Sequence, residues 1–136
     1  MGAPYTAFLF AIFYQFGKLQ SSRAEGSLQI QYRNKKLQQL CEVSATAEKQ
    51  LGPQSAKKLQ IRLAALEAAA RVTDLVAGDP HPLKGDRLGQ FALSLAGGAR
   101  LVFSAAHSSC PTLVDGSIDW SQITIVCVEF IGDYHD

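Results

Sequence analysis

The sequence has few of the residues that stabilise small secreted or metal-bound domains. Its three cysteines, Cys41, Cys110 and Cys127, are an odd number without C-x-x-C spacing, which favours neither a disulfide framework nor a zinc module. No apolar run approaches the roughly 20 residues that a membrane-spanning helix needs. With 47% apolar and 18% charged residues in 136, the chain is expected to form one globular domain, and a reducing cytoplasm is the compartment that fits it.

Basic residues are absent from the C-terminal part of the chain. Eleven of the thirteen Lys and Arg lie between residues 33 and 100, and none follows residue 100, where five acidic residues lie. The net charge of +1 therefore hides a basic body and an acidic end. Such a chain suits a polyanion or an acidic partner, although segregated charge is also common in proteins that bind neither.

The first 27 residues differ from the rest of the sequence. Residues 8–14 are all apolar or aromatic, but no positive charge precedes them and no A-x-A site follows closely, so they are not typical of a secretory signal. A polar stretch then leads to Leu28. Residues 1–27 are therefore treated as an N-terminal extension, with three interpretations: an added strand or helix, a partner-binding arm, or sequence upstream of a true start at Leu28. Residues 28–136 are expected to form a single domain.

Two helices are expected next. The positions 37, 40, 41, 44, 47 and 51 follow helical spacing, and Gly52-Pro53 ends the pattern, so a helix is predicted over 37–51. Pro53 suits the first turn of a second helix. The apolar face of that helix is formed by Ala56, Leu59, Leu63, Leu66 and Ala70, and Lys57, Lys58, Arg62 and Glu67 are predicted to lie off it. Two short helices joined so tightly predict an antiparallel hairpin.

The pattern changes to strands after a proline-rich break at residues 78–82. Apolar residues alternate with small or polar ones over 91–95 and 101–103, and Gly97-Gly98 between them predicts a β-hairpin. Residues 108–121 read as a loop, and 123–131 is apolar on both faces apart from Thr124 and Glu129, as expected of a strand inside a sheet. With a short strand over 28–32, the order predicts an α+β fold in which a two-helix hairpin packs on a small, mostly antiparallel sheet.

Three polar clusters carry groups that can perform chemistry. They are residues 81–87, Arg100 in the second hairpin strand, and residues 133–136 at the end of the chain. Neighbouring strands would bring all three to one face of the sheet. Taken one at a time, each group is more often a solvated surface residue than a catalyst.

Together the clusters hold what metal-free RNA cleavage requires. The 2′-OH must lose a proton, the charge on the phosphoryl oxygens must be stabilised, and the leaving 5′-oxygen must gain a proton. Imidazoles suit the proton transfers, Lys and Arg suit the charge, and Tyr can stack on a base. The sequence supplies His81, Lys84, Arg87, Arg100, Tyr134 and His135.

These residues resemble those of a known family. His81-Pro82-Leu83-Lys84-Gly85, a hairpin containing Arg100-Leu101-Val102-Phe103, and a terminal Asp133-Tyr134-His135 resemble, in that order, the HigB branch of the RelE/ParE toxin superfamily over residues 28–136. Ala99 and Phe91 stand where many relatives have tryptophan, and the loop over 108–121 is longer than in the smallest members. These departures bear on substrate preference more than on fold.

The resemblance implies a toxin of a type II toxin–antitoxin pair that acts as a ribosome-dependent mRNA endoribonuclease, with no metal or other cofactor. Its partners would be the ribosome, the message and a helix-turn-helix antitoxin encoded by a neighbouring gene. It would not bind a membrane. The resemblance further implies roles at matching positions. The catalytic set is His81, Lys84, Arg100, Asp133, Tyr134 and His135, and the set contacting RNA or the ribosome is Lys57, Lys58, Arg62 and Arg87.

Three alternatives remain from the sequence. A ParE-like poison of DNA gyrase shares the superfamily but generally lacks the nuclease residues. A degenerate toxin would bind its antitoxin without catalysis. A zinc site would draw on residues without ligand spacing, namely His81, His107, His135, Cys110 and Cys127.

Overall fold

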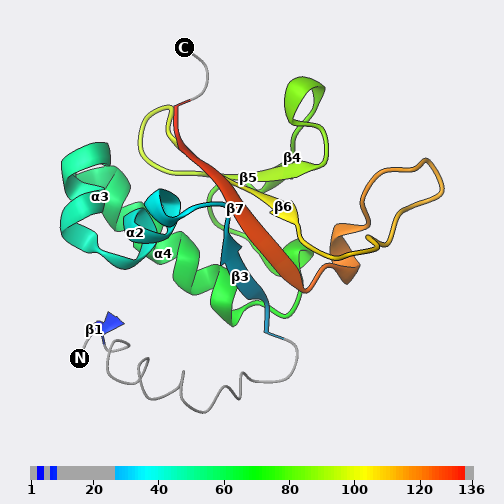
Figure 1. Ribbon diagram of the computed structural model, residues 1–136, viewed down its shortest axis with the longest axis horizontal. Coiled ribbons are helices and arrows are strands. Elements are labelled where there is room, and N and C mark those ends of the chain that lie inside the picture. Colours follow the sequence, from blue (N-terminus) through cyan, green and yellow to red (C-terminus); the bar gives the residue numbers. More distant parts are fainter. Residues whose placement is uncertain (1–2, 5–6, 9–26, 134–136) are drawn as a thin grey trace.

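The computed structural model describes residues 3–4, 7–8 and 27–133 and has an α+β architecture. Its larger sheet has the strand order β3-β7-β6-β5-β4, with β3 parallel to β7 and the other neighbours antiparallel. The strands are β3 (Gln29–Tyr32), β4 (His81–Pro82), β5 (Gln90–Ser94), β6 (Arg100–Ala105) and β7 (Ile125–Gly132). The predicted hairpin and the interior position of the last strand are therefore confirmed (Figure 1).

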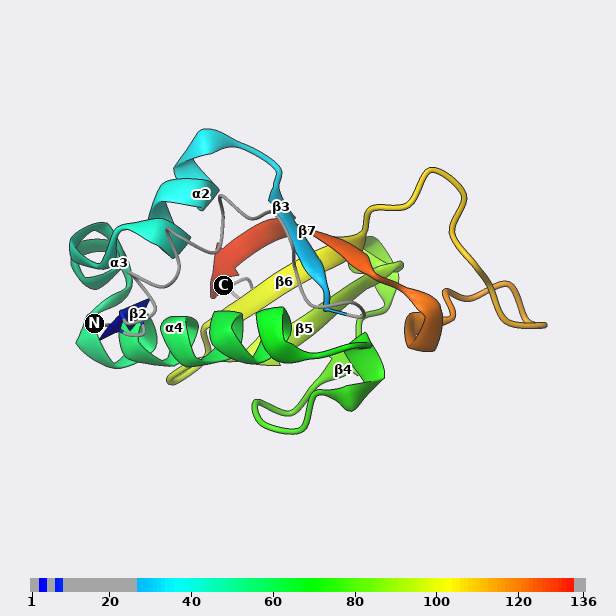
Figure 2. The same cartoon turned by 90° about the horizontal axis from the view of Figure 1, so that it is seen from below.

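The helices are α2 (Lys35–Glu42), α3 (Ser44–Leu51) and α4 (Pro53–Ala68). Gly52, with φ of 88°, forms the tight turn between α3 and α4, and Pro53 occupies the first turn of α4. The predicted helical hairpin is confirmed as the α3–α4 pair. Figure 2 shows α4 running in front of the strands, so the helices cover one face of the sheet.

The prediction of one helix over 37–51 is wrong. Val43 has extended dihedral angles, φ −117° and ψ 104°, and separates α2 from α3. Its N–H donates to the Gln39 carbonyl, and its own carbonyl accepts from Thr46 and Ala47, so it caps both helices. Because the break takes a single residue, the apolar spacing persists across it, and the periodicity alone does not reveal it. Ala70, predicted on the second helix, lies beyond the end of α4.

The two faces of the sheet differ in composition. The face toward the helices, here called the core face, presents aliphatic and aromatic side chains. Phe103, Leu101, Leu93, Val126 and Val128 are fully buried there and pack with Leu59 and Leu66 of α4. Phe91 stacks on Phe103, with ring centroids 5.5 Å apart, and Trp120 packs against both rings. Burial of each such side chain contributes roughly 1.5–3 kcal/mol to folding.

The residues of the opposite face, here called the polar face, are identified from the register of the strands. His81 pairs with Ala92, Ala92 with Val102, and Val102 with Phe130, so these residues form one row across the sheet. Ser94, Arg100 and Gly132 form the next row toward the hairpin turn. Residues 81 and 100, which the sequence placed in separate clusters, therefore share this face.

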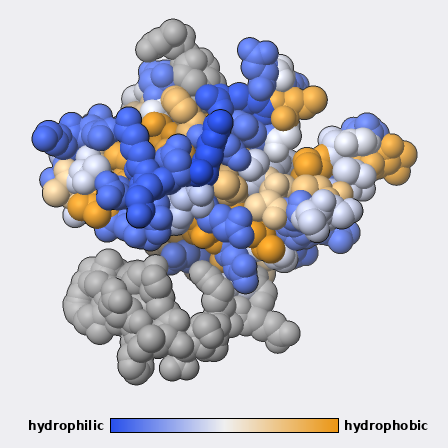
Figure 3. Space-filling view, viewed as in Figure 1, coloured by the Kyte–Doolittle hydropathy of each residue, from blue (hydrophilic) through white to orange (hydrophobic). Residues whose placement is uncertain are grey.

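Several segments extend from this body. Residues 106–119 form a loop that projects on the right of Figure 1, and Figure 3 shows hydrophobic surface there. Within this loop Leu113 is exposed and Val114 is fully exposed. In the N-terminal extension, β1 (Ala3–Pro4) pairs antiparallel with β2 (Ala7–Phe8), and the other residues up to 26 lie outside the described part of the chain. None of the helices in the described residues is long and apolar enough to cross a membrane.

Candidate functional site on the polar face

His81 is held by a backbone carbonyl beside it. Its Nδ1 lies 2.7 Å from the carbonyl oxygen of Asp79 and 3.8 Å from Asp79 Oδ2, and its side chain is 40% exposed. A carbonyl oxygen only accepts, so Nδ1 is the donor, and the tautomer that fits this contact has Nε2 as its acceptor nitrogen. Asp79 has a φ of 51°, rare for a residue other than glycine, and its carbonyl oxygen lies beside Nδ1 of the ring. The arrangement is that of an oriented base.

Arg87 crosses the polar face above its central strand. It lies in a short 3-10 turn, η2 (Gly85–Arg87), its Nη1 donates to Gln90 Oε1 at 3.0 Å, and its guanidinium lies 4.7 Å from the ring centre of Phe130. Gln90 belongs to β5 and Phe130 to β7, so the side chain spans β6, where Val102 is fully buried. A cation–π contact and a hydrogen bond thus fix the position of this charge.

Lys84 and Arg100 supply further positive charge. Lys84 precedes η2 and is exposed, whereas Arg100 is half-buried and its Nη1 donates to the Ala99 carbonyl at 3.1 Å. Arg100 pairs across the sheet with Gly132, the last residue of β7. The last strand therefore ends beside Arg100.

Of the terminal triplet, the structure describes Asp133. Its carboxylate lies against the hairpin turn, where a Cβ on Gly98 would come within 2.5 Å of Oδ2. A side chain at position 98 would therefore have to displace the Asp133 carboxylate. Tyr134 and His135 lie outside the described residues.

The predicted RNA-contacting cations on α4 separate into two groups. Lys57 and Lys58 are exposed, on the side of α4 away from the core. Arg62 is 9% exposed, and its Nε donates to the Ser94 carbonyl of β5 at 2.9 Å. The prediction that Arg62 lies off the apolar face is wrong, because position 62 follows Leu59 by three residues and precedes Leu66 by four. This helical spacing is the feature of the sequence that predicts the burial of Arg62.

Arg62 instead supports the segment that leads to His81. A Cβ on Gly78 would lie 2.6 Å from Arg62 Nε, and the Gly78 carbonyl accepts from the Ser94 N–H at 2.7 Å. Arg62 therefore packs where α4, β5 and residues 78–81 meet. Its charge is used within the fold rather than at its surface.

Three further polar-face residues were not predicted as site residues. Ser104 of β6 donates to Glu129 Oε2 at 2.7 Å, and Glu129 lies in an irregular stretch of β7 where Phe103 pairs with Val128 and Val102 with Phe130. The extra residue is a β-bulge, which turns both Glu129 and Phe130 to the polar face. Strict alternation would have placed Phe130 on the core face, so the sequence pattern gave no signal for it.

The thiols and remaining imidazole are not arranged as a metal site. No group of three or more His, Cys, Asp or Glu within the described residues could hold a metal ion. His107 Nε2 accepts from the backbone N–H groups of Thr124 and Ile125, at 2.9 and 3.2 Å, and so ties the projecting loop to β7. Burial raises the pKa of the Cys41 thiol to about 12. Burial, with Glu129 adding to it, also raises the pKa of Cys127, so neither is an activated thiolate.

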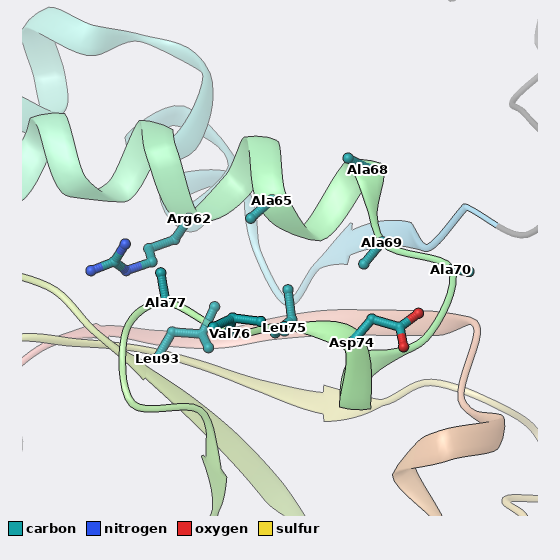
Figure 4. Close-up of a pocket in the computed structure, with 10 residues that line it drawn as sticks. All are labelled: Arg62, Ala65, Ala68, Ala69, Ala70, Asp74, Leu75, Val76, Ala77 and Leu93. Atoms are coloured by element: carbon teal, nitrogen blue, oxygen red, sulfur yellow. The ribbon is translucent and has the colours of Figure 1, made fainter.

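A groove lies on the other side of the sheet from His81. The end of α4, residues 74–77 and Leu93 enclose a groove of about 550 Å³, drawn in Figure 4. Half of its lining residues are alanines. Its two charged residues are Arg62, which donates to the Ser94 carbonyl, and Asp74, whose carboxylate lies 3.5 Å from Arg71. The lining contains no imidazole, in contrast to the polar face, which carries His81.

A comparison with models of known protein families finds no match, and a comparison with curated proteins finds no similar sequence. The function of this chain therefore has to be inferred from the residues of the polar face.

Proposed function

We propose that this chain is the toxin of a type II toxin–antitoxin pair and cleaves messenger RNA on the ribosome, in the cytoplasm. The observation that carries the proposal is that His81 and Arg100 share the polar face, with His81 Nδ1 engaged by a carbonyl so that Nε2 is left as a base. The resemblance to the HigB branch of the RelE/ParE superfamily supports the same reading.

The reaction needs no metal or other cofactor. The 2′-oxygen attacks the adjacent phosphorus, the bond from phosphorus to the 5′-oxygen breaks, and a 2′,3′-cyclic phosphate and a 5′-hydroxyl result. One group takes the proton of the 2′-OH, and another gives a proton to the 5′-oxygen. His81 Nε2 is the proposed base, and His135 is the proposed acid.

The cations of the site stabilise the phosphorane. Arg100 and Lys84 are proposed to bind its nonbridging oxygens, because charge in fixed positions lowers the barrier most where negative charge develops. Arg87, held between Gln90 and Phe130, binds a neighbouring phosphate. Tyr134 positions the base, and Asp133 orients its neighbours at the chain terminus.

Lys57 and Lys58 are proposed to contact ribosomal RNA. They are exposed on α4, which covers the opposite face of the sheet from His81. They are therefore suited to anchor the protein to the ribosome while the polar face receives the message. Such phosphate contacts are independent of sequence and weaken with salt. Arg62 is left out of this set because it is buried.

The test is induced expression of the full chain, followed by primer extension on a translated reporter message and on a twin with a defective start codon. Cuts in the translated message alone are expected, and a helix-turn-helix antitoxin from the neighbouring gene should suppress them. Growth arrest without cuts in either message would indicate a gyrase poison. Expression without arrest would indicate a non-catalytic antitoxin-binding protein.

Substitutions of single residues test which residues form the proposed site. Lys84→Ala and His135→Ala should relieve growth arrest while the antitoxin still binds, because each removes a group that we propose acts on the RNA. Lys36→Ala, an exposed change at the start of α2, is the matched control and should leave arrest intact. Unchanged arrest in both site variants would overturn the assignment.

A further inference from the structure

Glu129 stands out among the strands of the large sheet. In the described strands β3 to β7 it is the only acidic residue, and it lies on the face that also carries His81, Arg87 and Arg100. A face that binds phosphates gains nothing from a carboxylate, which repels them. The position of Glu129 therefore calls for a ligand group other than phosphate.

The carboxylate is fixed in direction. Ser104 donates to Oε2 at 2.7 Å, and Arg33 Nη1 lies 3.6 Å from Oε1. The bulge in β7 turns Glu129 to the polar face beside Phe130. A carboxylate has about four acceptor sites, and these two contacts use at most two of them. Both oxygens therefore retain capacity for a further donor.

The ion pair with Arg33 does not account for this carboxylate. The Arg33 side chain is 66% exposed and the Glu129 side chain 19%. A pair with so exposed a partner contributes only about 0–1 kcal/mol to stability. The half-buried acid is therefore better explained by what it can bind.

We propose that Glu129 recognises a guanine in the message by accepting hydrogen bonds from the N–H groups of its Watson–Crick edge. Guanine presents N1–H and N2–H side by side, which match the two oxygens of a carboxylate. Adenine and cytosine place an acceptor next to their amino group, and uracil places acceptors on both sides of its N–H, so each would set an acceptor against the carboxylate. Bases of single-stranded RNA are read through such edges. This inference rests on the proposed function.

The placement makes the guanine a neighbour of the scissile nucleotide. Ser104, which holds Glu129, lies four residues along β6 from Arg100, a separation of about 13 Å. Phe130, which carries the Arg87 guanidinium on its ring, lies in the row between Ser104 and Arg100. Glu129 is thus a base-reading residue and not a catalytic one.

The test is to map cut sites in all cellular messages after expression of the full chain, wild type and Glu129→Gln. Glutamine keeps the shape but replaces one acceptor by a donor. The wild type should show guanine at a fixed offset from the cut. Glu129→Gln should reduce that preference roughly tenfold or more while cutting continues, since a bidentate contact discriminates bases by about 5- to 150-fold. Glu48→Gln, the same change on exposed α3, should keep the preference.

The outcomes separate this inference from the proposed function. Cuts by the wild type without guanine preference, or an equal preference in Glu129→Gln, would overturn the inference and leave the nuclease in place. Absence of cuts in the wild type would remove both. If Glu129→Gln unfolds at a lower temperature, Glu129→Asp keeps both acceptors and should retain the preference at a reduced rate; loss of the preference there would also count against a reading carboxylate.

Discussion

The two faces of the same sheet are used for different purposes. On the core face, Leu93, Leu101 and Phe103 are fully buried against α4 and the ring of Trp120. The residues that follow or precede them in the same strands lie on the polar face and include Ser94, Arg100 and Ser104. One residue of shift along a strand therefore separates a side chain that stabilises the fold from one that can meet a substrate.

Phe103→Ala should cause the largest loss of stability. Phe103 is fully buried between Phe91 and Trp120, and truncation of such a ring leaves a cavity costing about 3–5 kcal/mol. The free energy of unfolding, measured with urea, checks this. Ser104→Ala, the next residue and on the polar face, should cost about 1 kcal/mol for one lost hydrogen bond. Equal losses in both variants would remove the distinction between the faces.

Arg62→Met tests a charge that lies on the core side. The substitution removes the bond to the Ser94 carbonyl and should lower the free energy of unfolding by about 1.5–3 kcal/mol. Lys58→Met, on the exposed side of the same helix, should stay within about 0.5 kcal/mol of wild type. Urea unfolding of the two variants compares them directly. A similar small effect for both would mean that Arg62 is a surface cation after all.

The buried thiol of Cys41 should make the free energy of unfolding depend on pH in the alkaline range. Its pKa in the folded protein is raised to about 12, so above about pH 9 the unfolded chain loses the thiol proton while the folded chain keeps it. This contribution to stability is present below pH 9 and is lost as the pH rises toward 12, by up to about 1.4 kcal/mol per pH unit. Unfolding of the wild type and of Cys41→Ala should be compared at pH 8, 9 and 10. The wild type should show the steeper decline, and parallel curves would contradict a buried neutral thiol.

Asn34→Ala should have the smallest effect. The Asn34 side chain accepts from the Leu37 N–H at 2.9 Å and caps α2. Loss of such a cap costs about 1 kcal/mol, which thermal unfolding detects. Because α2 packs on the core side, message cleavage by this variant should match that of the wild type. Reduced cleavage without further loss of stability would mean that the helices take part in the site.

The sequence was sufficient for the parts of the fold that local patterns specify. Gly97, with φ of 61°, and alternating apolar residues set the β5–β6 hairpin, and Gly52-Pro53 set the turn between α3 and α4. Val43 was missed because a one-residue break leaves helical spacing almost unchanged. The bulge at Glu129 was missed because it depends on pairing with β6, which no local pattern encodes.

The candidate site was predictable in its residue types but not in its contacts. His81, Lys84 and Arg100 could be named from their chemistry, since sequential strands usually lie side by side. That Arg87 reaches across β6 to Phe130, and that Ser104 orients Glu129, follows from residues far apart in the chain. The helical spacing of Arg62 predicts its burial, but its charge led to the prediction that it lies on the exposed face.

We propose that the polar face cleaves RNA with His81 as the base, and the substitution His81→Asn removes that base. Asparagine can keep a donor near the Asp79 carbonyl while removing the acceptor at the Nε2 position. Primer extension on a translated message should show cleavage reduced by about a hundredfold or more, with stability within about 0.5 kcal/mol of wild type. Cleavage at the wild-type rate by a folded His81→Asn protein would contradict the claim.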